Sequence, residues 1–409
     1  MKKRVAVTGM ALASPLGSKV ETAFERLKVF KNCVEHWEVL DEYDKLNTKL
    51  AARVQGFEIP KHFTRKVIRT MGPVSVMAAA TAEEALLQAG LLDDQIISSG
   101  QTGVSYGSSS GSLDAIMDFY SMCIDKEVKT LNSGSYIKMM AQTTAVNLSL
   151  YFKTHGRLIP TSTACTSGSM GIGYAYEMIK NGYQTVMIAG GGEEIHPAQM
   201  GVFDTLFATS TKNDTPKLTP SPFDIERDGL VIGEGAGTLI LEEYEHAKAR
   251  GANIIAEIAG FSTNTDGTHI TNPNKDMMKE VMLQSLSDAG LSPEAIGYIN
   301  AHGTATVNGD IAESNATVEV FKNKVPVSSI KSYTGHTLGA CGAIEAILTI
   351  EMMKNKWFCP NLNLKNPDPE CGNLDYITGT GREIDIEYAM TNNFAFGGIN
   401  TSIILKKPD

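Results

Sequence analysis

Short apolar, β-branched segments alternate along the chain with longer segments whose apolar residues recur at helical spacing. RVAVTG at residues 4–9 and TGVSYGSS at residues 102–109 are of the first kind, and TMGPVSVMAAATAEEALLQAG at residues 70–90 is of the second. The pattern predicts a first strand from Arg4 to Thr8 that enters a turn at Gly9, then a helix, then another strand. This alternation is typical of α/β proteins.

A duplication inside the chain gives more information about the fold. Residues 159–183 (IPTSTACTSGSMGIGYAYEMIKNGY) parallel residues 325–357 (VPVSSIKSYTGHTLGACGAIEAILTIEMMKNKW), and each copy has the pattern of a strand, a small-residue turn and a helix. A second echo follows each copy, GEGAGTLILEE at 233–243 and FGGINTSIILKK at 396–407. Chance similarity is the alternative for either repeated segment alone. Both repeated segments in the same order indicate two related halves with mostly parallel sheets.

The length of 409 residues allows two or three ordinary domains. With the duplication, we expect two halves, residues 1–250 and 251–409, that pack directly because no linker rich in Pro, Gly or Ser separates them. Apolar residues make up 42% and charged residues 20% of the chain, which is typical of a folded protein. The net charge of -10 argues against general nucleic-acid binding, so an acidic partner would need a local basic patch.

The amino terminus and the cysteines bear on the cellular compartment. Residues 1–4 (MKKR) followed by VAVTGMALA imitate a short signal peptide, but the same residues fit a first strand, and no apolar run is long enough to span a bilayer. The six cysteines show no CxxC pair or regular spacing, so we expect neither a disulfide framework nor a structural zinc site. No HExxH, Walker loop or dinucleotide fingerprint is present. We therefore expect a cytoplasmic protein without a metal or redox cofactor.

Cys165 is the candidate nucleophile. It lies in TSTACTSGSMGIG, where a β-favouring segment leads into small residues and then a helical pattern. This predicts a thiol on a strand-to-helix elbow, at the positive end of the helix dipole. A free thiol has a pKa of about 8.5, and a helix amino terminus with a neighbouring imidazole lowers that pKa by about one to several units. The alternative is a buried cysteine that acts as a small hydrophobe.

Two histidines occur in similar glycine-rich settings at strand ends, His302 in YINAHGTATVNGD and His336 in SSIKSYTGHTLGACG. Histidine suits acid-base work near neutral pH. A structural role is the alternative for each histidine alone, but three elbows in the order Cys, His, His favour a shared catalytic centre.

Four motifs, STACTSG, NAHGTAT, IKSYTGHTLGACGAIEA and NNFAFGGIN, together resemble the elongating β-ketoacyl-acyl carrier protein synthases, and the similarity runs from about Arg4 to Leu405. The resemblance implies a thiolase fold, an αβαβα five-layer sandwich of two pseudo-symmetric halves, usually dimeric. It also implies an acyltransferase of fatty acid or type II polyketide chain elongation. Its substrates are carried on the phosphopantetheine of acyl carrier protein, and no other cofactor is implied.

The same resemblance implies roles for individual residues. Cys165 takes the acyl group as a thioester, and His302 and His336 donate hydrogen bonds to the malonyl thioester oxygen. The backbone N–H groups of Cys165 and Phe396 form an oxyanion hole, and the Phe396 side chain acts as a gate. The other matches are Lys331 and Glu345, which would form a buried pair or, alternatively, a surface pair, and Thr304 and Thr306, which would bind the phosphopantetheine arm.

A basic cluster is a candidate docking patch for an acidic carrier protein. Lys61, Arg65, Lys66 and Arg69 lie in PKHFTRKVIRTMG, and the pattern predicts a helix on which Arg65 and Arg69 face the same side. A local positive field can steer an acidic partner to a negatively charged protein. The alternative is a solvated charge run.

Two departures from the family pattern concern the substrate. The gate has Ala395 and Ile399 where Gly and Thr are usual, and Ser110 stands where saturated-chain enzymes usually carry a bulky apolar residue. A small hydroxyl residue there would widen or polarise the acyl pocket, so we hypothesise a polyketide or aryl-polyene substrate. Rival interpretations are a non-elongating thiolase-superfamily member, either a thiolase, for which Cys341 would be a second cysteine, or an initiating synthase, which would pair Cys with His and Asn, and a non-catalytic chain-length partner. A homodimer and a heterodimer with a chain-length-factor-like subunit both remain open.

Overall fold

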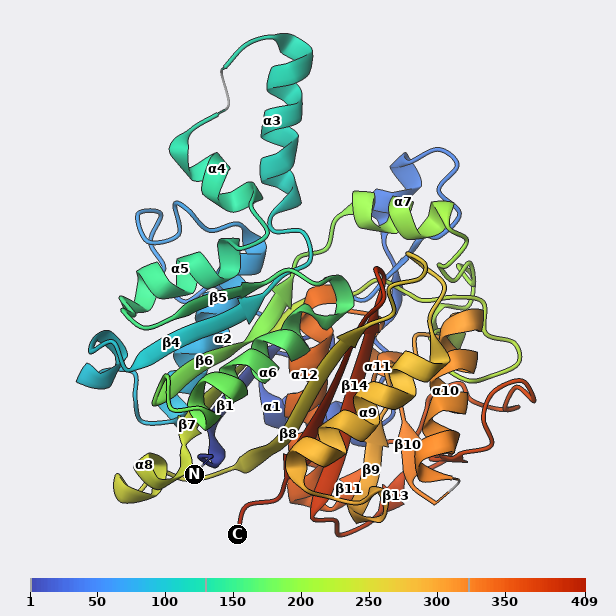
Figure 1. Ribbon diagram of the computed structural model, residues 1–409. Helices are drawn as coiled ribbons and strands as arrows, with labels where there is room; N and C mark the ends of the chain where they lie inside the picture. Colours follow the sequence, from blue (N-terminus) through green and yellow to red (C-terminus); the bar gives the residue numbers. More distant parts are fainter. Residues whose placement is uncertain (1, 129–130, 323) are drawn as a thin grey trace.

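The computed structural model describes residues 2–128, 131–322 and 324–409 (Figure 1). Its main feature is an eleven-stranded sheet in the order β12-β10-β9-β14-β15-β8-β1-β7-β6-β4-β5. The strands of the first half are β1 (Val5–Ala13), β4 (Thr102–Gly107), β5 (Leu158–Thr161), β6 (Val186–Glu193) and β7 (Gly235–Glu243). Those of the second half are β8 (Ala256–Thr265), β9 (Ile296–Asn300), β10 (Pro326–Ser328), β12 (Asp375–Tyr376), β14 (Tyr388–Ala395) and β15 (Ile399–Lys406).

The two halves have the same strand order and directions. From the centre outward the first half runs β1-β7-β6-β4-β5 and the second β8-β15-β14-β9-β10. In both, the second strand is antiparallel to its two neighbours and the remaining pairs are parallel. The duplicated segments therefore occupy equivalent places: β5 corresponds to β10, and β7 to β15.

Helices form three layers around these strands (Figure 1). The outer helices of the first half are α2 (Pro73–Gln88) and α5 (Thr143–Phe152), and those of the second are α9 (Lys275–Ala289) and α10 (Val307–Phe321). Between the two groups of strands lie α6 (Ser167–Lys180) and α12 (Cys341–Asn355), which contact each other and strands of both halves. All residues of α12 from Cys341 to Met353 are buried, as expected for a helix without a polar face. The arrangement confirms the predicted αβαβα thiolase-type sandwich.

The remaining elements surround this core. α3 (Leu113–Asp125) and α4 (Ser133–Met139) stand away from the sheet in Figure 1, and α7 (Pro197–Thr205) lies at the same end of the molecule. The others are short: α1 (Val20–Lys28), α8 (Tyr244–Ala249), α11 (Lys331–Thr334), β2 (Glu35–His36), β3 (Leu50–Ala51), β11 (Trp357–Phe358) and β13 (Arg382–Glu383). Across residues 2–128, 131–322 and 324–409, none of the helices combines the length and apolar character needed to cross a membrane.

The predicted turn at Gly9 is wrong. β1 continues to Ala13, and its register with β7 shifts between Val7 and Gly9. Gly9 permits close approach of α2, because a Cβ there would lie 2.1 Å from the Ala85 carbonyl oxygen. The glycine thus serves helix–sheet packing instead of a turn.

Candidate active site

Cys165 lies on the strand-to-helix elbow that the sequence predicts. β5 ends at Thr161, a 3-10 turn covers Ala164–Thr166, and α6 begins at Ser167. The turn places Ala164 at a φ of 50°, a left-handed conformation uncommon for a residue with a side chain. The Ser167 hydroxyl supports it by accepting the Thr163 N–H at 3.0 Å and donating to the Ala164 carbonyl at 2.7 Å.

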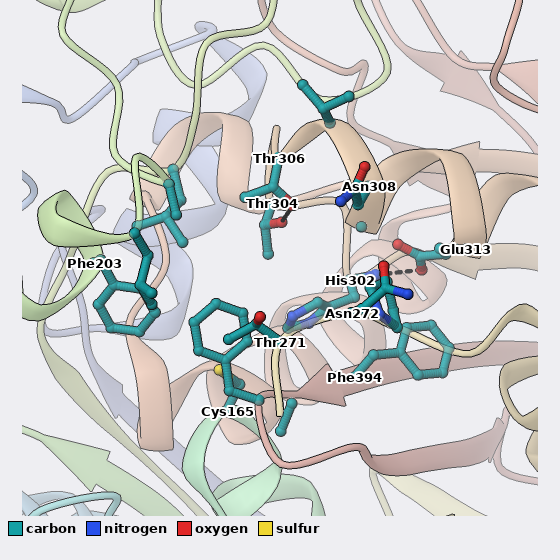
Figure 2. A pocket seen from close by; sticks show the side chains of 18 of the residues that line it. Cys165, Phe203, Thr271, Asn272, His302, Thr304, Thr306, Asn308, Glu313 and Phe394 are labelled. Carbon is teal, nitrogen blue, oxygen red and sulfur yellow. Dashed lines mark hydrogen bonds between the residues drawn. The ribbon is translucent and has the colours of Figure 1, made fainter. Parts of the chain in front are cut away.

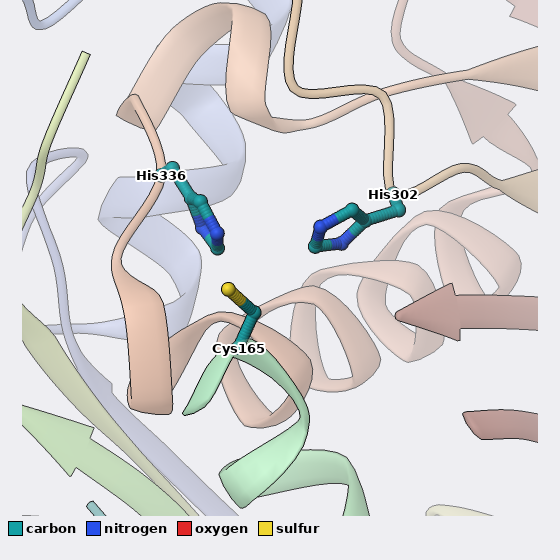
Figure 3. A group of neighbouring side chains, drawn as sticks. All are labelled: Cys165, His302 and His336. Carbon is teal, nitrogen blue, oxygen red and sulfur yellow. The ribbon is translucent and has the colours of Figure 1, made fainter. Parts of the chain in front are cut away.

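The structure brings together the three residues expected at the catalytic centre (Figure 3). The ligand atoms of Cys165, His302 and His336 all lie within 4.8 Å of one another. The two imidazole rings are perpendicular, with centroids 5.2 Å apart. His302 follows the end of β9, and His336 follows α11, so loops from the second half carry both rings to the thiol of the first. Each of the three side chains is buried.

Burial decides the resting protonation state of this centre. It raises the pKa of the Cys165 thiol to about 11, against the opposing effects of the Lys331 charge and the backbone N–H groups of Phe396 and Cys165. The elbow alone predicts a lowered pKa for this thiol, so the observed direction of the pKa shift is opposite to the expected one. Burial, with the Lys331 charge, also holds the pKa of both histidines well below the usual value. At neutral pH the site therefore holds a thiol and two neutral imidazoles, each of which can accept one proton.

Lys331 and Glu345 form a buried ion pair, with 2.5 Å between Nζ and Oε1 and almost no exposure of either side chain. The surface alternative is thus wrong for this pair. Asn393 of β14 adds a contact that the sequence analysis did not single out. Its Nδ2 donates to Glu345 Oε2 at 2.8 Å and lies 3.4 Å from His302 Nδ1. Asn393 therefore links the ion pair to His302.

Glu313 is a second residue that the sequence analysis missed. Its carboxylate accepts the backbone N–H groups of His302 and Gly303, each at 2.7 Å. Burial raises the pKa of Glu313 to about 8. The residue fixes the loop that carries His302, but α10 gives no local sequence sign that this acid points inward.

A pocket lined by residues of both halves leads to Cys165 and His302 (Figure 2). Thr304 and Thr306 line it, with their hydroxyl oxygens 2.9 Å apart, and Asn272 and Asn308 also contribute side chains. Cys165, His302 and His336 belong to the same lining. Both threonines thus stand where a polar arm reaching the thiol would pass.

A second pocket meets the first at Cys165, Phe203 and Phe396, which line both. The Phe396 ring packs on Phe203 with centroids 5.3 Å apart. The lining of this second pocket is mostly apolar and consists of Ser109, Ser110, Leu113, Ala164, Cys165, Ala198, Gln199, Val202, Phe203, Leu338 and Phe396. Ser110 lines it as expected, but its hydroxyl donates to Glu193 at 3.0 Å and is not left to polarise the cavity.

The basic cluster lies outside these pockets. Lys61, Arg65, Lys66 and Arg69 are exposed, but the predicted helix is wrong: residues 61–70 form turns, and α2 begins only at Pro73. One helical-type bond forms there, from Ile68 N–H to the Thr64 carbonyl at 3.1 Å. Arg65 and Arg69 nevertheless line a common surface hollow, where Lys138 of α4 joins them.

The thiol and the two imidazoles also have the composition of a zinc site. Metal-ligating histidines usually donate their second ring nitrogen to a neighbouring group. Within the described residues, both ring nitrogens of His336 are without a hydrogen-bond partner. The expectation that the protein holds no resident metal stays a prediction.

Two family models match this chain one after the other. A family model described as the β-ketoacyl synthase N-terminal domain matches residues 2–247, and one described as the C-terminal domain matches residues 255–365. A 3-oxoacyl-[acyl-carrier-protein] synthase 2 from Vibrio cholerae is 38% identical over 99% of both chains. A β-ketoacyl synthase crystal structure from Burkholderia phymatum is 54% identical, with a TM-score of 0.98 over 100% of both chains. A structure of a type II polyketide synthase acyl carrier protein with its ketosynthase is 30% identical, with a TM-score of 0.89 over 100% of both chains.

Proposed function

This chain belongs to the β-ketoacyl synthase family, and we propose that it extends an acyl chain held on Cys165 by decarboxylative condensation with malonyl-acyl carrier protein. The observation that carries the assignment of residues is the convergence of Cys165 with His302 and His336 where two pockets meet. One pocket accommodates the arm that delivers each thioester, and the other accommodates the acyl chain.

In the first step the Cys165 sulfur attacks the thioester carbonyl of an acyl carrier protein. The thiol is protonated at rest, so its proton passes to a neutral imidazole as the S–C bond forms. The carrier's thiol leaves with a proton, and the acyl chain remains on Cys165. Phe396, between the two pockets, moves to admit that chain.

In the second step malonyl carrier protein enters through the pocket lined by Thr304 and Thr306. The bond to its carboxylate breaks, carbon dioxide leaves, and the electron pair forms an enolate. Neutral His302 and His336 can each donate one N–H to the enolate oxygen.

In the third step the enolate carbon attacks the Cys165 thioester. The backbone N–H groups of Cys165 and Phe396 hold the oxyanion of the tetrahedral intermediate, a role supported by their favourable effect on a Cys165 thiolate. Collapse expels the Cys165 thiolate, which takes up a proton from solvent, and leaves a 3-oxoacyl chain on the carrier protein. Lys331, Glu345 and Asn393 keep His302 aligned from behind.

A specific contact disfavours the thiolase interpretation. Cys341 is buried, and its Sγ donates to the Cys165 carbonyl at 3.2 Å. In the described part of the chain it lines neither pocket that reaches Cys165. A second catalytic cysteine would have to face the substrate. A non-catalytic chain-length partner is disfavoured by the presence of Cys165 itself.

Acyl carrier protein is the proposed partner, docking at Lys61, Arg65, Lys66 and Arg69, and its phosphopantetheine supplies the only prosthetic group that the reaction needs.

The protein works as a homodimer or beside a chain-length-factor-like subunit. Six free cysteines agree with a cytoplasmic location. The halves divide at residue 250. Ser110 lines the second pocket with a small side chain, and the wider pocket favours a polyketide or aryl-polyene chain over saturated chains.

The deciding experiment is incubation with acyl carrier proteins that bear different chains, followed by intact-mass measurement. We expect one acyl adduct on the wild-type protein, no adduct on Cys165→Ala, and a wild-type level on the matched control Cys341→Ala. The favoured chain identifies the pathway. An adduct that persists in Cys165→Ala would contradict the proposed mechanism.

A further inference from the structure

Glu193, the last residue of β6, is a fully buried carboxylate that the proposed mechanism does not use. Its Oε2 accepts the N–H of Ser109 at 2.8 Å, the Ser109 hydroxyl at 2.5 Å and the Gly339 N–H at 3.1 Å. Its Oε1 accepts the Ser110 hydroxyl at 3.0 Å. Two of these donors are backbone N–H groups that can only donate, so they favour an acceptor at this place.

These contacts join two parts of the site. Ser109 and Ser110 form a wall of the second pocket, which also contains Cys165. Gly339 belongs to the 3-10 turn Leu338–Ala340, three residues after His336. One carboxylate therefore bridges the acyl-chain wall and the segment that carries a catalytic imidazole.

His336 depends on such backbone contacts for its position. Within the described residues its ring nitrogens have no hydrogen-bond partner. Its backbone N–H donates to the Val231 carbonyl at 2.7 Å, and its carbonyl accepts the Gly233 N–H at 2.9 Å. The Gly339–Glu193 bond holds the other end of the same short segment. A shift of the Ser109–Ser110 wall would thus be passed to His336.

The next residue offers a comparison. Glu194 is also buried, but it accepts the N–H groups of Val74 and Leu113 at 3.1 and 2.9 Å and the Ser112 hydroxyl at 3.0 Å. These donors lie at the starts of α2 and α3. Glu194, the residue after β6, thus holds helix starts that include Leu113 of the second pocket, whereas Glu193 also reaches the Gly339 turn.

We propose that Glu193 is a positioning residue that makes the alignment of His336 depend on which acyl chain occupies the second pocket. A chain that fits leaves the Ser109–Ser110 wall and the Gly339 turn in register, and decarboxylation proceeds. A chain that displaces the wall displaces His336 as well, so condensation is selective even after Cys165 is acylated. This inference rests on the proposed function.

The test compares the wild type with Glu193→Gln and the matched control Glu194→Gln. Each protein is first acylated with a short, a medium and a long chain, and the adduct is measured by intact mass. Decarboxylation of malonyl carrier protein is then followed for each adduct. For Glu193→Gln we expect the ratio of decarboxylation rates between best and worst chains to fall at least tenfold, while Glu194→Gln stays within twofold of the wild type.

The outcomes distinguish a failure of the proposed function from a failure of the proposed role of Glu193. A wild type that forms no Cys165 adduct overturns the proposed function, and this inference with it. If the wild type discriminates and Glu193→Gln retains the same ratio, or slows equally with every chain, only the role of Glu193 is overturned. Should Glu193→Gln not fold, Ser110→Ala replaces it: a smaller ratio supports the link, and an unchanged ratio rejects it.

Discussion

The elbow at residues 163–167 and the elbow at residues 337–341 occupy equivalent places in the two halves, each between a parallel strand and a central helix. Their backbones agree: Ala164 has a φ of 50° and Leu338 a φ of 47°. The next residue is Cys165 in the first elbow and Gly339 in the second. One elbow presents a sulfur to the substrate, and the other presents an N–H to Glu193.

α6 and α12, which follow these elbows, also carry different side chains at equivalent positions. If EMIKN and EMMKN are aligned, Gly171 in α6 corresponds to Glu345 in α12. A Cβ at Gly171 would lie 2.4 Å from the Gly190 carbonyl oxygen, so this position is used for close packing on β6. Glu345 instead pairs with Lys331. The repeated backbone sets the geometry, and a few exchanged side chains make one copy the nucleophile and the other its support.

The largest expected effect concerns the thiol of the first elbow. With a pKa of about 11, the alkylation rate of Cys165 by iodoacetamide should rise about tenfold per pH unit from pH 7 to 10, roughly 10³-fold in all, because the thiolate is the reacting form. Mass spectrometry of the Cys165 peptide gives the rate, and Cys165→Ala identifies that peptide. A rate that levels off near pH 7 would show that the helix end and imidazoles outweigh burial.

Breaking the ion pair on either side of the second elbow should cost the most stability. Lys331→Met leaves Glu345 buried without its partner, at a cost of about 3–5 kcal/mol in the free energy of unfolding. The double variant Lys331→Met/Glu345→Gln should recover part of that loss but not the activity. Urea denaturation and condensation assays measure the two quantities. Equal stability of the single and double variants would argue against the pair.

The contribution of the two imidazoles to the rate should be separable from that of the nucleophile. In His302→Ala or His336→Ala, each lost donor should raise the decarboxylation barrier by roughly 3 kcal/mol, which is about 10²-fold in rate. Acylation should suffer less in either variant, since the other imidazole can still take the thiol proton. Decarboxylation of malonyl carrier protein and intact mass report on the two steps. A variant that loses acylation alone would reverse the assignment.

A feature of this molecule could be predicted from the sequence when it depends on residues that are close together in the chain. The duplicated segments and the apolar run of α12 are local, so the layered fold and its repetition could be predicted. The elbows of Cys165, His302 and His336 are local too. Their convergence in space was inferred from the order of the three elbows together with the family resemblance, and the structure shows it.

Other features depend on distant contacts. Asn393 and Glu313 reach His302 from β14 and α10, and Glu193 reaches Gly339 across 146 positions. The direction of the Cys165 pKa also follows from burial, which no short motif encodes. The turn at residues 61–70 was missed because its basic pattern at helical spacing is equally compatible with turns.

Gly339→Ala tests why the second elbow carries glycine where the first carries cysteine. The new Cβ would lie 2.7 Å from Glu193 Oε2 and 2.8 Å from the Ser109 nitrogen. Overpacking of this kind costs about 1–3 kcal/mol. The free energy of unfolding should fall by that amount, and thermal denaturation measures it. A neutral effect would mean that the Glu193 cluster is loosely packed.

The smallest effect should come from Ala164→Gly, which relaxes the first elbow. A left-handed conformation costs a residue with a side chain about 1–2 kcal/mol, and glycine avoids this cost but loses about 0.5–1 kcal/mol through its freer unfolded state. We expect a net stabilisation of roughly 0.5 kcal/mol by urea denaturation. Because a freer turn holds the Cys165 sulfur less firmly, acylation should slow by a few-fold although the protein is more stable. The matched change Leu338→Gly removes a buried side chain and should destabilise the protein, so opposite signs at the two equivalent positions would show that backbone conformation and packing contribute separately to the elbows.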